Sequence, residues 1–143
     1  MSIETMLAPT RYRYVADEKL NGATFTPSGL AGFVAQQIVP LVPKNRTPLR
    51  ILDPAVGEGS LLVSLLQELS VCGISDVEVY GFDKNLKSLR MAEGTIQNRF
   101  PQIPIYFRAS DFLEHTCHFG SSPSLFDDQS ANQRYDVIIA NQP

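Results

Sequence analysis

The chain has 143 residues and a mass of 15.8 kDa, the size of one domain. Hydrophobic residues make up 43% of it and aromatic residues 9%, a composition that excludes a disordered chain. The formal net charge is −3, whereas a protein that holds duplex DNA by its phosphates carries an excess of Lys and Arg. If nucleic acid is a substrate, we therefore expect most of the surface that contacts its phosphates to lie outside this chain.

The sequence has no feature of a membrane or secreted protein. No apolar run approaches the ~20 residues that a membrane helix needs. The first ten residues contain Glu4 and no apolar segment typical of a signal peptide. Cys72 and Cys117 lie in unrelated contexts, which is typical of reduced thiols. We therefore predict a cytoplasmic protein without membrane contact.

The predicted elements begin with an N-terminal arm, residues 1–21, followed by one domain, residues 22–143. A first helix is expected after Thr26, a plausible N-cap, with Pro27 at the first helical position, where its missing N–H does no harm. The apolar stripe predicted for this helix consists of Leu30, Phe33, Val34, Ile38 and Leu41.

Four short apolar segments are typical of buried strands: residues 49–52, 77–82, 105–108 and 135–140. Helical periodicity separates the first three. One helix, residues 60–69, has an apolar stripe of Leu61, Leu62, Leu65, Leu66 and Leu69. Another, residues 84–100, has Leu86, Leu89, Met91 and Ile96 as its apolar positions, and Met91 and Phe100 are expected in the core. Residues 112–134 are either a mobile loop or contain a short helix.

This alternation of helices and strands predicts a doubly wound α/β fold. Its sheet is mostly parallel, with helices on both faces and right-handed crossovers.

Each predicted strand runs into a polar residue: Asp53, Asp83, Asp111 and Asn141. The carboxyl ends of parallel strands share one edge of an open sheet, and ligands bind there. Any one of these side chains is more typical of a helix cap. Their equivalent positions after all four strands favour one binding crevice into which they converge.

The loop after the first strand indicates what this crevice binds. Gly57 and Gly59 allow a tight turn and a close approach by a ligand. A dinucleotide-binding loop has a third glycine where Leu62 stands, and the carboxylates of Asp53 and Glu58 would repel a pyrophosphate. The loop therefore favours a phosphate-free nucleoside with positive charge, a description that S-adenosylmethionine fits.

Two further positions suit a nucleoside. Asp83 is placed to accept hydrogen bonds from ribose hydroxyls. Asp111 offers an acceptor for an adenine amino group, and Phe112 offers an aromatic face, although core packing explains Phe112 equally well.

In these residues the chain resembles the cofactor domain of amino-group DNA methyltransferases, the N6-adenine type of restriction–modification systems. Residues 22–27, GATFTP, resemble the opening motif G-x-[FY]-[FY]-T-P, and residues 53–59 resemble D-P-A-x-G-x-G. Residues 80–83 and 110–112 lie where the ribose and adenine contacts are expected. Residues 138–143, IIANQP, look like the approach to the catalytic motif [DN]-P-P-[YF].

The resemblance implies a Rossmann-like class I methyltransferase fold that uses S-adenosylmethionine to methylate adenine N6 in a specific DNA sequence. The implied cofactor-binding residues are Thr26, Pro27, Asp53, Pro54, Ala55, Gly57, Gly59, Asp83, Asp111 and Phe112, and the implied catalytic residues are Asn141, Gln142 and Pro143. No metal site is predicted, because the H-x-C-H sequence at residues 115–118 lacks a fourth ligand.

Two departures from the family motif affect its last residues. Gln142 stands where the family has its first proline, and the aromatic residue expected after Pro143 is absent. In the family, the target amine donates to the Asn side chain and to the next main-chain carbonyl. Gln142 retains that carbonyl but loses the stiffness of proline. We expect a fold truncated after its fourth strand, in a chain that binds S-adenosylmethionine weakly and methylates nothing alone.

Other functions remain open from the sequence. The same motifs suit a methyltransferase that acts on a protein glutamine or an RNA base, and a cofactor-binding scaffold without catalysis. A nicotinamide oxidoreductase is a further alternative. The expected partners are DNA, bound mainly outside this chain, and the remainder of the enzyme or a specificity subunit.

Overall fold

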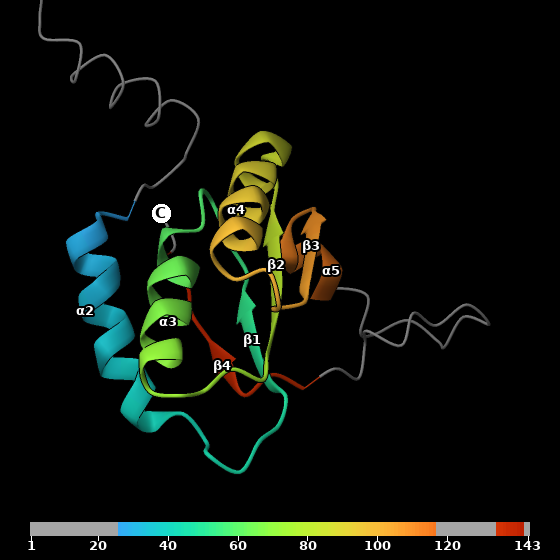
Figure 1. Ribbon diagram of the computed structural model, residues 1–143. Helices are drawn as coiled ribbons and strands as arrows, with labels where there is room; N and C mark the ends of the chain where they lie inside the picture. The colour runs from blue at the N-terminus through green and yellow to red at the C-terminus, as the bar shows by residue number, and fades with distance from the viewer. Residues whose placement is uncertain (1–25, 117–133, 142–143) are drawn as a thin grey trace, which may run out of the picture.

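The computed structural model describes residues 26–116 and 134–141. Its four strands form one parallel sheet in the order β3-β2-β1-β4 (Figure 1). The strands are β1, Leu49–Asp53; β2, Val77–Asp83; β3, Ile105–Ala109; and β4, Val137–Ile138. Because β2 and β4 lie on opposite sides of β1, the strand order reverses there. The carboxyl edge beside β1 is therefore the expected place for a ligand.

The last strand is shorter than predicted. The sequence suggests residues 135–140, whereas β4 pairs with β1 only through Val137 opposite Ile51 and Ile138 opposite Leu52. Two main-chain hydrogen bonds flank this pairing, from the N–H of Asp136 to the Arg50 carbonyl at 2.8 Å and from the N–H of Ile139 to the Leu52 carbonyl at 2.9 Å. Apolar character alone overestimates β4, because only two of its residues pair with β1.

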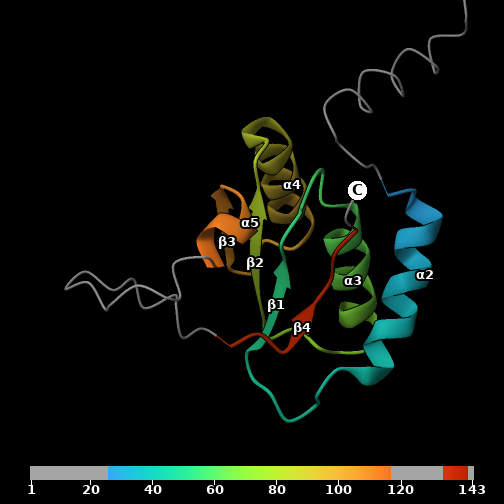
Figure 2. The same cartoon turned by 180° about the vertical axis from the view of Figure 1, so that it is seen from behind.

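The helices are α2, Ser28–Ile38; α3, Ser60–Val71; α4, Leu86–Arg99; and α5, Phe112–Thr116, with a 3₁₀ turn η1 at Val39–Leu41. Helices α3 and α4 cover the same face of the sheet, and α2 lies beside α3 (Figures 1 and 2). The short helix α5 packs on the other face, where the ring centroids of Phe112 and Phe82 are 5.2 Å apart. The prediction of helices on both faces is therefore confirmed. Within the described part of the chain, α5 is the only helix on the second face.

The core confirms the predicted leucine stripe. Leu61, Leu62, Leu65, Leu66 and Leu69 are all buried on α3. They pack with the inward side chains of β1 and β2 in one apolar cluster. This cluster fixes α3 against the sheet and so sets the position of the loop that precedes the helix.

Two predictions about the helices are wrong. In α2 the buried residues are Ala31 and Ala35, while Leu30 and Phe33 are 50% and 59% exposed. Small side chains allow α2 to pack closely on α3, which leaves the larger ones outside that contact. Met91 is 51% exposed, because α4 buries Leu89, Ala92 and Ile96 instead. Phe100 is buried as predicted.

The start of α2 also differs from the prediction. Pro27 occupies the N-cap position, with extended backbone angles of φ −56° and ψ 142° and no side-chain cap. Thr26 lies one residue earlier, so its hydroxyl is free for a contact elsewhere. In the described residues, no helix is long and apolar enough to cross a membrane.

Candidate functional site

The first part of the site is the turn after β1. Asp53 is 1% exposed, and its Oδ1 atom accepts a hydrogen bond of 2.9 Å from the N–H of Ala55. Its Oδ2 atom is buried and has no partner among the described residues. Burial raises the pKa of Asp53 to about 7, the Ala55 N–H opposes that rise, and the charge of Asp83 adds to it. Asp53 thus holds a buried oxygen to which no described residue donates a hydrogen bond.

The two glycines of this turn have different neighbours. Both have positive φ angles, +55° at Gly57 and +83° at Gly59, which favour glycine. A Cβ atom at Gly57 would meet nothing within 4 Å, whereas one at Gly59 would lie 2.9 Å from the Cβ atom of Ala92 in α4. Gly57 therefore leaves open space beside the turn. Gly59 instead allows close packing of the turn against α4, a reason the sequence did not reveal.

Asp83 joins this turn to the end of β2. Its Oδ2 atom accepts a hydrogen bond of 2.7 Å from the N–H of Gly57, and its Oδ1 atom accepts one of 2.7 Å from the N–H of Asn85. The residue that caps α4 is Asn85, which accepts from the N–H groups of Lys87 and Ser88. Helix capping therefore does not explain Asp83, which fixes the glycine turn against β2.

Asp111 does match the capping alternative, because its Oδ1 atom accepts from the N–H of Leu113 in α5 at 2.9 Å. Its Oδ2 atom also lies 2.7 Å from the Nζ atom of Lys84. This ion pair lowers the pKa of Asp111. The sequence did not predict a role for Lys84, because a single lysine directly after Asp83 has no pattern that distinguishes it from other surface lysines. We call residues 53–59, together with Asp83 and Asp111, the acidic turn.

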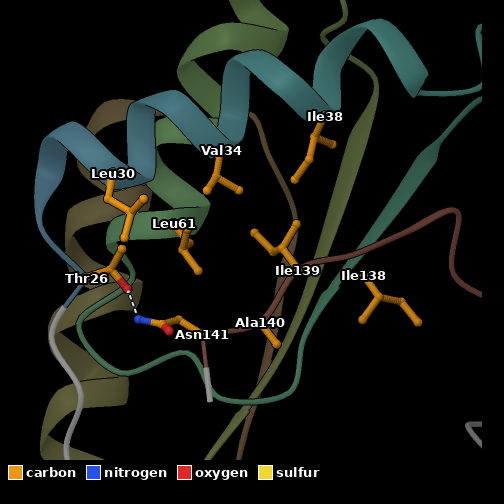
Figure 3. A pocket seen from close by; sticks show the side chains of 9 residues that line it. All are labelled: Thr26, Leu30, Val34, Ile38, Leu61, Ile138, Ile139, Ala140 and Asn141. Carbon is orange, nitrogen blue, oxygen red and sulfur yellow. Dashed lines mark hydrogen bonds between the residues drawn. The ribbon is translucent and has the colours of Figure 1, made fainter. Parts of the chain in front are cut away.

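Asn141 lies in a different part of the site. A cavity of about 270 Å³ lies between α2 and the end of β4, and Asn141 is at one end of it (Figure 3). The amide Nδ2 atom of Asn141 donates a hydrogen bond of 2.7 Å to the Oγ1 atom of Thr26. The cavity is lined by Thr26, Leu30, Val34, Ile38, Leu61, Ile138, Ile139, Ala140 and Asn141. We call it the α2–β4 cavity.

The predicted single crevice is therefore two neighbouring regions. Both lie at the carboxyl end of the sheet, but none of Asp53, Asp83 and Asp111 lines the α2–β4 cavity. The reason is the switch in strand order: Asp53 and Asp83 follow β1 and β2, and Asn141 follows β4 on the opposite side of β1.

The remaining predicted residues take these places. Pro27 is exposed at the start of α2, and Pro54 and Ala55 are half-buried in the acidic turn. Gln142, Pro143, Cys117 and His118 lie outside the described residues, as does the His115 side chain. Among the described residues, no group of three His, Cys, Asp or Glu side chains could hold a metal ion.

Comparison with known proteins relates this arrangement to methyltransferases. Type II methyltransferase M.BanIII of Aneurinibacillus aneurinilyticus is 28% identical over 130 residues, which is 88% of this chain and 22% of that protein. The chain thus spans about a fifth of the length of this relative.

Solved structures show the same fold. The methyltransferase subunit of a type I restriction–modification system from Streptococcus thermophilus superposes with a TM-score of 0.56 at 17% identity, over 92% of this chain and 26% of that one. A structure from Listeria monocytogenes, assigned to the class I S-adenosylmethionine-dependent methyltransferases, gives 0.54 at 20% identity, over 92% of this chain and 37% of that one. The N-6 DNA methylase family model matches residues 11–143, so the chain belongs to the N-6 DNA methylase family.

Proposed function

We propose that the chain is the cofactor-binding part of an S-adenosylmethionine-dependent DNA methyltransferase that acts on adenine N6 in a restriction–modification system. The observation that carries this proposal is the acidic turn, where a buried carboxylate oxygen without a partner lies beside an open glycine turn. Membership of the N-6 DNA methylase family supports the reaction. The catalysed reaction and the DNA contacts belong to the whole enzyme, since the relatives are several times longer than this chain.

The residues of the acidic turn fit this cofactor by charge. S-Adenosylmethionine carries ammonium and sulfonium charges and no phosphate, so a carboxylate is a better neighbour for it than a basic loop. Asp53 and Gly57 would hold the charged end, and Asp83 would accept from the ribose hydroxyls. Asp111 and Phe112 would contact the adenine, with Thr26, Pro27, Pro54, Ala55 and Gly59 completing the site.

Asp53 has a further electrostatic role in this proposal. With a pKa of about 7, it is only partly ionised at neutral pH in the ligand-free chain. A cationic ligand nearby favours the ionised form. Binding of the cofactor therefore releases a proton from Asp53, and the affinity for the cofactor rises as the pH rises through 7.

Asn141 would act on the substrate. When bound, the cofactor supplies a methyl group on a sulfonium, which is already a good leaving group. The chain has only to hold the target amine in line and to make its lone pair available. The Asn141 carboxamide oxygen can accept one N–H of that amine. The second acceptor would be the main-chain carbonyl of Gln142, which lies outside the described residues.

Calorimetric titration tests the cofactor. The 143-residue chain should bind S-adenosylmethionine and its demethylated product more tightly than NAD, and Asp53→Ala should weaken that binding at least about tenfold. Tighter binding of NAD would instead establish a nicotinamide enzyme.

Methyl incorporation into DNA by the full-length enzyme tests the reaction. Asn141→Ala should reduce it by at least about 100-fold, because a contact made to the reacting amine is lost. A full-length protein that binds the cofactor but is indifferent to Asn141→Ala would be a scaffold.

A further inference from the structure

We infer that the Thr26 hydroxyl orients the Asn141 carboxamide for methyl transfer, so that Thr26 is a positioning residue and not only a cofactor contact. The inference rests on the proposed function, because it takes Asn141 to accept a hydrogen bond from the target amine. It is carried by the 2.7 Å hydrogen bond from Asn141 Nδ2 to Thr26 Oγ1, which joins residues 115 positions apart.

Each partner is held by a different part of the fold. Asn141 follows β4, which is bonded to β1 as far as the contact between Ile139 and Leu52. Thr26 is 7% exposed and precedes α2, which packs on α3 through two alanines that are almost fully buried. The bond therefore connects two supports that the hydrophobic core places independently.

The chemistry of a carboxamide explains why such a bond matters. An Asn side chain has an acceptor oxygen on one branch and a donor NH₂ on the other, and rotation by half a turn exchanges them. The exocyclic amine of adenine is a donor and a poor acceptor, so the oxygen must face it. Donation from Nδ2 to Thr26 places the oxygen on the opposite branch. With the target amine on the side away from Thr26, only this orientation lets both the Nδ2 and the Oδ1 atom of Asn141 form a hydrogen bond.

The surroundings strengthen this arrangement. Most side chains that line the α2–β4 cavity are aliphatic, and Figure 3 shows Leu30, Val34 and Ile38 pointing from α2 into the cavity. These groups offer the carboxamide no alternative partner, and a hydrogen bond is stronger where the local dielectric is low. Loss of the Thr26 hydroxyl would leave the carboxamide free to rotate, which reduces the fraction of productive encounters.

The experiment compares Thr26→Val with Thr26→Ser in the full-length enzyme. Valine keeps the shape and removes the hydroxyl, and serine restores it. We expect Thr26→Val to lower kcat about tenfold, well beyond any rise in the Kd for S-adenosylmethionine, and Thr26→Ser to recover most of kcat. Thr95→Val is the matched control, since its Oγ1 atom donates to the Met91 carbonyl on the exposed face of α4.

Two outcomes would overturn the inference. One is an unchanged kcat in Thr26→Val. The other is a rise in Kd for S-adenosylmethionine that matches the fall in kcat/KM, which would make Thr26 a cofactor contact only. Asn141→Ala separates the two proposals. If Asn141→Ala abolishes methyl transfer while Thr26→Val leaves kcat unchanged, only the inference about Thr26 is wrong. If Asn141→Ala still transfers methyl groups, both the proposed role of Asn141 and the inference are wrong.

A second measurement does not depend on activity. The side-chain NH₂ of Asn141, observed by ¹⁵N NMR in the 143-residue chain, reports the hydrogen bond directly. Its resonances should move in Thr26→Val and stay in place in Thr26→Ser. Unchanged resonances in the valine variant would show that the bond does not form, and the inference would be wrong.

Discussion

The acidic turn and the α2–β4 cavity lie at the same end of the sheet but are built differently. The acidic turn consists of residues at or just after the ends of β1, β2 and β3, where main-chain N–H groups donate to the carboxylates. At one end of the cavity, a side-chain hydrogen bond joins opposite ends of the described chain. The first depends on neighbouring strand ends and the turns that follow them, whereas the second exists only when α2 and β4 are both in place.

The largest expected effect concerns the buried carboxylate of the acidic turn. Asp53 has a pKa of about 7 in the folded chain against an ordinary value of 3.8. From about pH 4 to about pH 7 the folded state therefore binds more protons than the unfolded state. The contribution of Asp53 to the free energy of unfolding falls over this range as the pH rises, by up to about 4 kcal/mol.

Urea unfolding of the chain and of Asp53→Asn at several pH values checks this. Asparagine does not titrate, so the variant should gain stability relative to wild type as the pH rises from about 4 to about 7. A constant difference between the two proteins across that range would show that Asp53 titrates normally, and the acidic turn would then be more solvated than its burial indicates.

A smaller effect on stability should distinguish Gly59, which packs against α4, from Gly57, which faces open space in the acidic turn. Gly59→Ala puts a Cβ atom 2.9 Å from Ala92 at a φ of +83°, so we expect a loss of about 2–4 kcal/mol in the free energy of unfolding. Gly57→Ala is the matched variant, since its Cβ atom meets nothing and only the positive φ remains, which costs about 1 kcal/mol.

The same pair should reverse its order in cofactor binding. Gly57→Ala fills space that the proposed function leaves for the ligand, so S-adenosylmethionine should bind it at least about tenfold more weakly by calorimetry. Folded Gly59→Ala should lose less affinity than Gly57→Ala, because its Cβ atom would meet Ala92 of α4. Equal losses of stability, or a Gly57→Ala chain that binds normally, would remove the distinction between the two glycines.

The smallest effect is expected at the rim of the acidic turn. Lys84 lies on the surface, and its ion pair with Asp111 holds the pKa of that carboxyl below its ordinary value. Lys84→Met should raise the pKa of Asp111, followed by NMR titration, with little change in stability because surface ion pairs contribute little. An unchanged pKa would show that the Leu113 N–H, and not Lys84, sets the titration of Asp111.

Much of the fold was predictable from local patterns. The leucine stripe of α3 indicates a helix by its spacing alone. The positions of β1, β2 and β3 follow from short apolar runs that end in Asp or at Ala109. Met91 and Leu30 were misjudged for one reason. An apolar residue at helical spacing shows that a face is amphipathic, but which neighbours cover that face depends on how the helices pack.

The sequence by itself determined the strand and helix order, the glycine turn and the acidic residues that follow the strands, because hydrophobic periodicity and backbone preference act over a few residues. Only the tertiary structure decided that Asp53 keeps a buried oxygen unpaired, that Gly59 serves a helix contact, and that Thr26 meets Asn141. Each of these depends on side chains brought together by packing of the whole core, and no local pattern carries that information.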